Sequence, residues 1–144
     1  MFTYEHKGIR VRYADTDQMG YVYYGNYGRF YEIGRVEALR SIGFSYRDME
    51  EAGTMMPVYE NYSRYLQPAR YDDELSIKVS IPELPTARVV FRYEIRNQEG
   101  SVLNTGETTL VFLNRETNRP TRAPAFLLEK LKPYFEKTDI STNP

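Results

Sequence analysis

Two carboxylates separated by one residue, Asp15 and Asp17, stand directly before a stretch of unusual composition. From Gln18 to Gly28 the chain has no charged side chain and is rich in tyrosine and glycine. A carboxylate beside an uncharged aromatic loop is suited to general-base or nucleophilic chemistry. Asp is also common where strands end, because its side chain caps local backbone. The spacing alone therefore leaves a catalytic and a structural interpretation open.

The residue types that are absent narrow the chemistry. The chain has no Cys, which excludes disulfides, thiolate nucleophiles and Cys-based metal sites. It has one His, His6, so a Ser–His–Asp triad or a His-rich metal site would depend on that single residue near the chain start. We therefore expect acid–base work to fall to carboxylates.

Length and charge limit the class of protein. The 144 residues suit one domain, and we predict a single domain over residues 1–144 with a frayed tail at 138–144. The net charge of −1 argues against a dedicated nucleic-acid binder. No apolar run is long enough for a membrane span, and residues 1–10 lack the apolar core of a signal peptide. The expected location is the cytoplasm.

The elements that would position the two carboxylates can be predicted from periodicity. Gly8–Tyr13 alternates like a half-buried strand. If the extended conformation continues, Asp15 and Asp17 share a side with Tyr13. From about Gly25 to Gly43 the apolar spacing is helical and covers most of the circumference, which predicts a buried helix with Asn26 as N-cap.

Shorter elements follow this helix. Residues 45–51 predict a second helix with a capping box, and the helix after Pro124 is expected to be the last. Between them the period is two, which predicts about four strands in hairpin order: 56–66, 75–81, 89–96 and 101–113. Antiparallel strands curling around a lone apolar helix form the simplest α+β architecture that buries both.

These residues resemble a known family. Tyr13–Asp17 followed by Gly20–Tyr27 looks like the signature of hotdog-fold acyl-CoA thioesterases, in the branch that contains 4-hydroxybenzoyl-CoA thioesterase and the Tol–Pal-associated enzymes. The match continues through Phe30–Arg35, Leu66–Asp73 and Gly106–Thr109. The resemblance implies a five- or six-stranded antiparallel sheet wrapped around the long helix. It also implies a homodimer or homotetramer with active sites at the dimer interface and no metal or redox cofactor.

The resemblance further implies hydrolysis of an acyl-CoA or acyl carrier protein thioester, with coenzyme A as part of the substrate. The catalytic carboxylate of the family matches Asp17, and the Tyr that stands four residues earlier in the Tol–Pal-associated branch matches Tyr13. Tyr24 stands where the Tol–Pal-associated branch has His, and the 4-hydroxybenzoyl-CoA enzymes resemble this chain in having Tyr. Asp17 would attack the thioester or deprotonate a water, with Tyr13 and Tyr24 handling protons or lining the pocket.

Substrate binding is expected at the start of the buried helix and at arginines. Backbone N–H groups from Tyr24, Gly25 and Asn26 onward could polarise the thioester carbonyl. Arginine suits the coenzyme A phosphates through paired donors, and we assign this role to Arg64 and Arg88. The other arginines considered are Arg70, Arg115, Arg119 and Arg122. A solvated loop is the alternative interpretation for each of them.

Two other functions compete with hydrolysis. A non-catalytic hotdog module would bind acyl-CoA or acyl carrier protein without turnover, although the intact Asp17, Gly20 and Asn26 argue against it. Hydratase or dehydratase chemistry normally pairs Asp with His in this fold, and no His lies near Asp17. We rank that chemistry last.

Overall fold

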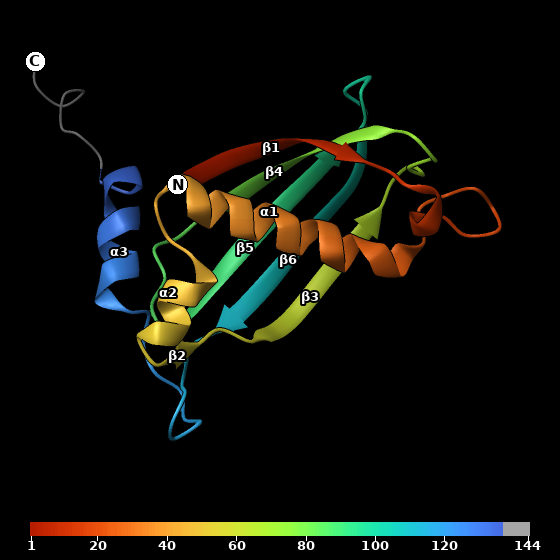
Figure 1. The fold of residues 1–144 in the computed structure, drawn as a ribbon. Helices are drawn as coiled ribbons and strands as arrows, with labels where there is room; N and C mark the ends of the chain where they lie inside the picture. The colour runs from red at the N-terminus through yellow and green to blue at the C-terminus, as the bar shows by residue number, and fades with distance from the viewer. Residues whose placement is uncertain (137–144) are drawn as a thin grey trace, which may run out of the picture.

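The computed structural model describes residues 1–136, so the tail predicted at 138–144 lies outside the described residues. Its elements are shown in Figure 1. The strands are β1 Phe2–Arg10, β2 Thr54–Met55, β3 Val58–Tyr65, β4 Glu74–Ile81, β5 Arg88–Arg96, β6 Val102–Val111 and β7 Leu113–Asn114. The helices are α1 Tyr27–Ser41, α2 Tyr46–Glu51 and α3 Ala125–Leu131, with 3-10 turns at Tyr13–Asp15, Tyr24–Asn26 and Lys132–Tyr134.

Five strands form one antiparallel sheet in the order β1-β4-β5-β6-β3, and α1 lies across one face of it (Figure 1). The predicted antiparallel sheet around a long helix is therefore present. The predicted hairpin order holds for β4, β5 and β6 but is wrong for β3, which pairs with β6 at the far edge. Alternating apolar residues identify a strand and its buried face, but they do not name its partner.

The first strand differs from the prediction over Gly8–Tyr13. Strand β1 covers Phe2–Arg10 and has a bulge between His6 and Ile9. The chain then turns into the 3-10 segment, so extended geometry does not continue to the carboxylates. Asp15 is consequently only 8% exposed whereas Tyr13 is 80% exposed, and the prediction that they share a side is wrong.

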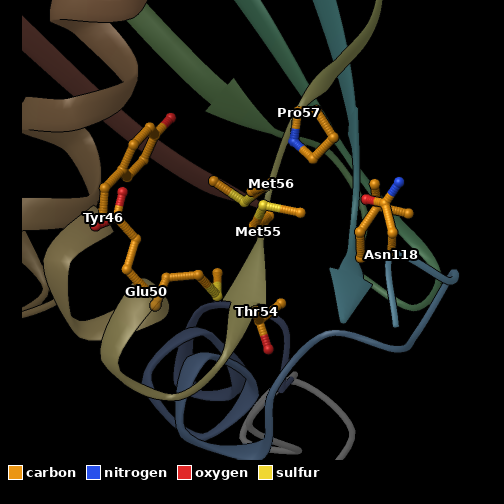
Figure 2. A pocket seen from close by; sticks show the side chains of 9 residues that line it. Tyr46, Glu50, Thr54, Met55, Met56, Pro57 and Asn118 are labelled. Carbon is orange, nitrogen blue, oxygen red and sulfur yellow. The ribbon is translucent and has the colours of Figure 1, made fainter. Parts of the chain in front are cut away.

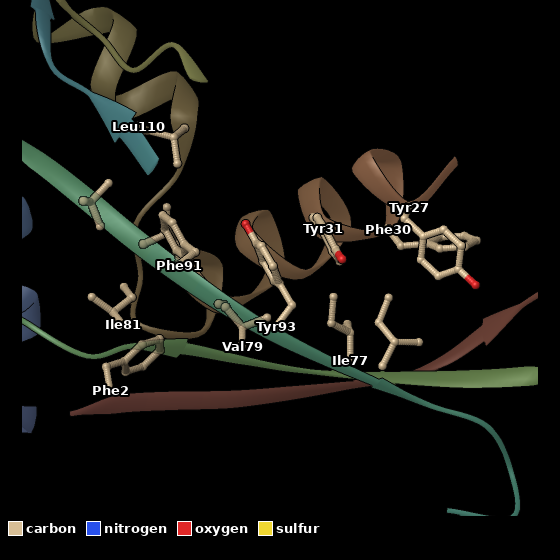
Figure 3. Packing of buried hydrophobic residues seen from close by; sticks show 14 of the residues in the cluster. Phe2, Tyr27, Phe30, Tyr31, Ile77, Val79, Ile81, Phe91, Tyr93 and Leu110 are labelled. Atoms are coloured by element: carbon tan, nitrogen blue, oxygen red, sulfur yellow. The ribbon is translucent and has the colours of Figure 1, made fainter. Parts of the chain in front are cut away.

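Helix α1 packs closely on the sheet, as its apolar circumference predicts. Figure 3 shows Phe30 and Tyr31 of α1 directed toward strand residues of the core. Gly34 allows the closest approach, because a Cβ there would lie 2.9 Å from Val79 Cγ2 and 3.0 Å from Ile77 Cδ1. The helix can therefore approach the sheet this closely only because residue 34 has no side chain.

Helix α1 ends close to Gly43, the last residue of the range predicted to be helical. This glycine has a φ of +79°, and its N–H donates to the Arg40 carbonyl at 2.9 Å. The N–H of Phe44 donates to the Leu39 carbonyl at 3.0 Å, which completes a Schellman motif. The capping box predicted for α2 is also present, with Ser45 Oγ accepting from the N–H of Asp48 at 3.2 Å.

A polar layer lies between α1 and the sheet. The Tyr31 and Tyr93 rings stack with centroids 4.1 Å apart, and the Tyr31 hydroxyl hydrogen-bonds with Ser63 and Asn104. Burial raises the pKa of Tyr31 and that of Tyr93 to about 12. Gly106 makes room for the Tyr31 ring, since a Cβ there would lie 2.2 Å from its hydroxyl oxygen. The layer fixes α1 over β5 and β6.

Candidate active site

Asp17 belongs to the segment between β1 and α1. This segment lies at the end of the sheet where α1 begins (Figure 1). The Asp17 N–H donates to the Tyr21 carbonyl at 2.8 Å, and the Gly20 N–H donates to the Asp17 carbonyl at 3.0 Å. Oδ1 of Asp17 accepts from the Met19 N–H at 2.8 Å. Oδ2 has no hydrogen-bond partner among residues 1–136, so an exposed carboxylate oxygen is held in a fixed loop and remains available.

Asp15 has a different environment from Asp17. Its Oδ2 accepts from the Arg12 N–H at 2.8 Å, and its Oδ1 forms an ion pair with Arg29 of α1. Its backbone carbonyl accepts from the Tyr23 N–H at 2.9 Å and from Asn26 Nδ2 at 2.8 Å. Asp15 therefore fastens the loop to the start of the helix, which agrees with the structural interpretation of this residue.

The start of the helix is built from a 3-10 turn, Tyr24–Asn26, that runs directly into α1. Asn26 lies inside this continuous helical segment, and its side chain bonds to Asp15 rather than to the helix. Asn26 therefore holds the predicted N-cap position of α1, but its side chain makes no capping hydrogen bond to the helix. The N–H groups of Tyr24 and Gly25 have no backbone acceptor among the described residues, because they open the turn. They form the positive end of the helical segment.

Packing also explains why position 25 is occupied by glycine. A Cβ at Gly25 would lie 2.6 Å from Cε2 of Tyr23, so the Tyr23 ring occupies the space that a side chain would need. The Tyr23 ring lies 4.8 Å from that of Tyr24, and Tyr24 in turn meets Tyr65 of β3 at 6.3 Å. The uncharged run therefore forms an aromatic surface around the helix start.

Tyr13 and Tyr24 are both exposed, and each packs against another tyrosine. Tyr13 is 80% exposed and packs edge-on against Tyr71 at 5.8 Å, and Tyr24 is 64% exposed. Neither hydroxyl forms a hydrogen bond to the Asp17 carboxylate within residues 1–136. The described ring contacts of both residues are with other tyrosines.

Arg64 and Arg88 lie apart in the chain. Arg64 in β3 pairs with Thr105, toward the end of the sheet where α1 begins. Arg88 opens β5 at the opposite end, and its guanidinium lies 5.3 Å from the ring centroid of Tyr59. One chain therefore does not bring these two arginines together.

A pocket of about 440 Å³ lies far from Asp17, where α2, β2 and the residues before β3 meet (Figure 2). It is lined by Tyr46, Met49, Glu50, Thr54, Met55, Met56, Pro57, Leu113 and Asn118. Sequence reasoning did not identify it. The available signal was the apolar dipeptide Met55-Met56 directly before Pro57, in a chain with only 5 Met residues.

Two observations concern metals and membranes. Within residues 1–136, no group of three or more His, Cys, Asp or Glu side chains could hold a metal ion. No helix in this described part of the chain is long and apolar enough to cross a membrane.

Comparison with known proteins identifies the family. The profile of the Thioesterase-like superfamily matches residues 11–131. The chain belongs to this superfamily. It is 33% identical to acyl-CoA thioester hydrolase YbgC of Escherichia coli over 124 residues, which are 86% of this chain and 92% of YbgC. It is 30% identical to the 1,4-dihydroxy-2-naphthoyl-CoA hydrolase of Thermosynechococcus vestitus over 99 residues, 68% of each chain.

Solved structures of thioesterases support the same assignment. A DHNA-CoA thioesterase from Staphylococcus aureus superposes on this thioesterase with a TM-score of 0.85 and 30% identity, covering 96% of this chain and 98% of that one. A 4-hydroxybenzoyl-CoA thioesterase of 21% identity has the same fold, with a TM-score of 0.80 over 90% of this chain and 99% of that one. The predicted family, the α+β hotdog fold and the enzyme class of thioester hydrolase are therefore confirmed.

Proposed function

We propose that this thioesterase hydrolyses acyl-CoA thioesters to a free acid and coenzyme A, with Asp17 as nucleophile or general base. The observation that carries the proposal is the free Oδ2 of Asp17, held in the loop that Asp15 fastens to the helix start. The unpaired N–H groups of Tyr24 and Gly25 lie at that same helix start. A carboxylate oxygen and two N–H donors on one rigid segment are what thioester hydrolysis needs.

The proposed chemistry follows from these groups. The thioester carbonyl oxygen accepts from the N–H groups of Tyr24 and Gly25, whose fixed dipoles stabilise the negative charge that develops in the transition state. Asp17 then attacks the carbonyl carbon to form an anhydride that water resolves, or it takes a proton from an attacking water. In both routes the carbon–sulfur bond breaks and the coenzyme A thiolate leaves. Tyr13 and Tyr24 enclose the reacting group.

The proposed active unit contains two copies of the chain joined through β3. This strand is a sheet edge, and four of its large side chains are about half or more exposed: Val58 at 52%, Tyr59 at 62%, Tyr62 at 58% and Tyr65 at 51%. An exposed edge rich in tyrosine is a template for pairing with another strand. A second copy pairs with it isologously, as closed homodimers do. Pairing of two β3 edges is compatible with a dimer and with a tetramer built from such dimers.

Pairing through β3 would also unite the two predicted phosphate-binding arginines. With a two-fold axis through the middle of antiparallel β3 strands, Arg64 of one copy faces Tyr59 of the other. Arg88 of that other copy already stacks on Tyr59. The pair of guanidinium groups suits the phosphates of coenzyme A. The proposal includes acyl carrier protein thioesters as alternative substrates, a cytoplasmic location, and a reaction without a metal or redox cofactor.

The test of this function is turnover by Asp17→Asn. Loss of the nucleophilic or general-base step is expected to lower kcat by about 100-fold or more. Asp17 is exposed and its side chain accepts one local hydrogen bond, so the variant should fold like the parent. Unchanged turnover of every acyl- and aroyl-CoA thioester in a panel would refute the assignment. Rapid-quench mass spectrometry of the parent enzyme distinguishes the two routes, because only the nucleophilic route forms an acylated Asp17.

The competing non-catalytic module makes the opposite prediction. It would bind acyl-CoA with the same affinity in the parent and in Asp17→Asn, and neither protein would release free coenzyme A. Calorimetric binding and a thiol-release assay on the same samples separate the two functions.

A further inference from the structure

The loop that carries Asp17 is held in shape by its own backbone. The Tyr23 N–H donates to the Asp15 carbonyl at 2.9 Å, and the Asp17 N–H donates to the Tyr21 carbonyl at 2.8 Å. An isolated antiparallel bridge lies between these two bonds. The loop is therefore a small antiparallel turn. Its internal bonds do not determine how it is oriented toward the helix start that follows Tyr23.

Two side chains of the helical segment reach back to the same residue of this loop. Asn26 Nδ2 donates to the Asp15 carbonyl at 2.8 Å, and the Arg29 guanidinium forms an ion pair with Oδ1 of Asp15. The helix thus binds both the main chain and the side chain of Asp15. Because Asp15 stands two residues before Asp17, a displacement of Asp15 is passed on to the Asp17 carboxylate.

The place of Arg29 in α1 is unfavourable for the helix itself. Arg29 is the third residue of α1, and a cation in the first turn opposes the helix dipole. The arginine of the last turn, Arg40, has the favourable placement and pairs with Glu37 at 2.9 Å. The Arg29 side chain is half exposed and could extend into solvent, yet it turns to Asp15. Its contact with the loop accounts for an arginine at this position.

Asn26 has both of its nitrogen atoms engaged within the protein. Its backbone N–H donates to the Tyr23 carbonyl at 2.9 Å, and Nδ2 donates to the Asp15 carbonyl. The N–H groups of Tyr24 and Gly25, which precede it, have no backbone acceptor within residues 1–136. These two groups are therefore the donors available to a thioester, whereas Asn26 is suited to holding the loop against the helix start.

We propose that Arg29 and Asn26 are positioning residues for the hydrolysis reaction. Acting through Asp15, they fix the Asp17 carboxylate relative to the free N–H groups of the helix start. The inference rests on the proposed function and adds to it the residues that orient the attacking group. A misplacement of about 1 Å in an active site can cost about 100-fold in rate. Loosening either contact should therefore slow the chemical step.

The first experiment removes each contact and measures turnover of acetyl-CoA and benzoyl-CoA. We expect Arg29→Met and Asn26→Ala each to lower kcat about 10-fold or more and to change KM less than about 3-fold, because the orientation matters in the transition state. Arg29→Lys keeps the positive charge and should recover most of the lost kcat. Arg40→Met removes an exposed ion pair from the same helix, so this matched control should keep the parent kcat.

The second experiment separates positioning from a loss of folded enzyme. Arg29→Met and Asn26→Ala are each combined with Asp17→Asn, and the residual turnover is measured at high enzyme concentration. Without the carboxylate there is no attacking group to orient, so each added substitution should lower the residual turnover less than about 2-fold. A smaller folded fraction would instead reduce the turnover of Asp17→Asn by the same factor as that of the parent.

An unchanged kcat in Arg29→Met or in Asn26→Ala would overturn the role of that residue. So would a loss of kcat that recurs in full in the Asp17→Asn background, and for Arg29 a loss that Arg29→Lys does not recover. Failure of the proposed function looks different, because Asp17→Asn alone would then hydrolyse both thioesters at the parent rate. That result would overturn the positioning role together with the function on which it rests.

Discussion

Substituting Gly106 by alanine should expel a buried ring from the core. The added Cβ would lie 2.2 Å from Oη, 2.4 Å from Cζ and 2.7 Å from Cε2 of Tyr31. The ring cannot tilt away easily, because Tyr31 is fully buried and lies parallel to Tyr93 with centroids 4.1 Å apart. Any displacement also breaks the hydrogen bonds of the Tyr31 hydroxyl with Ser63 and Asn104.

The size of the effect follows from these two losses. Overpacking in a dense core costs about 1–3 kcal/mol, and each lost hydrogen bond about 1 kcal/mol more. We expect Gly106→Ala to lower the free energy of unfolding by about 3–5 kcal/mol, and Tm by about 10–17 °C for a domain of this size. Urea unfolding followed by circular dichroism at one fixed protein concentration measures the change.

A double-mutant cycle tests the physical cause. Tyr31→Leu removes the ring atoms that a Cβ at 106 would meet, so adding Gly106→Ala to that background should cost less than about 1 kcal/mol. Gly28→Ala is the matched control, since a Cβ there meets nothing within 4 Å; it should be neutral or stabilise α1 by up to about 1 kcal/mol. Equal costs of Gly106→Ala with and without the Tyr31 ring would refute the reasoning.

Three further predictions concern pH and local structure. Because burial raises the pKa of Tyr93 to about 12, the folded chain keeps this proton while the unfolded chain loses it near pH 10, so stability falls as the pH rises from about 10 to 12. Tyr93→Phe should lose about 2–3 kcal/mol less over that range in urea titrations; identical pH slopes would contradict this. Asp15→Ala should destabilise by about 2 kcal/mol in thermal melts, since it removes the acceptor of a loop N–H and an ion-pair partner; a change within about 0.5 kcal/mol would show that Asp15 does not fasten the loop. Ser45→Ala should lose about 1 kcal/mol and speed hydrogen exchange at the Asp48 N–H, which the serine side chain accepts from, whereas Ser45→Asp should restore both.

The parts of the fold that were predictable are those encoded by local pattern. The apolar spacing of α1, the left-handed glycine Gly43 and the capping box at Ser45 each specify an element or its end through contacts within a few residues. The structure has all three. The environments of Asp15 and Asp17 differ in a way that spacing alone left open: Asp15 is engaged with Arg12 and Arg29, whereas within residues 1–136 only one oxygen of Asp17 accepts a hydrogen bond.

The parts that were missed depend on contacts between distant segments. Pairing of β3 with β6 and the early end of β1 are decided by which strands meet in three dimensions, and a period of two residues does not record that. Asn26 looks like an N-cap by type and position, yet its side chain bonds to the backbone of Asp15, a partner that only the folded loop brings near. The methionine-lined pocket likewise forms where α2, β2 and β7 converge.

The placement of β3 has a consequence for folding. Strands β4, β5 and β6 can pair as successive hairpins, whereas β3 must find β6 across the intervening chain, with Val58 opposite Leu110. Closing this loop has a larger entropic cost than closing a hairpin, so β3 is expected to dock after β4, β5 and β6 have paired. Until it does, β6 presents an open edge that accepts β3 from any nearby chain. Refolding at high protein concentration should therefore produce strand-swapped dimers, in which each β3 completes the sheet of the other chain.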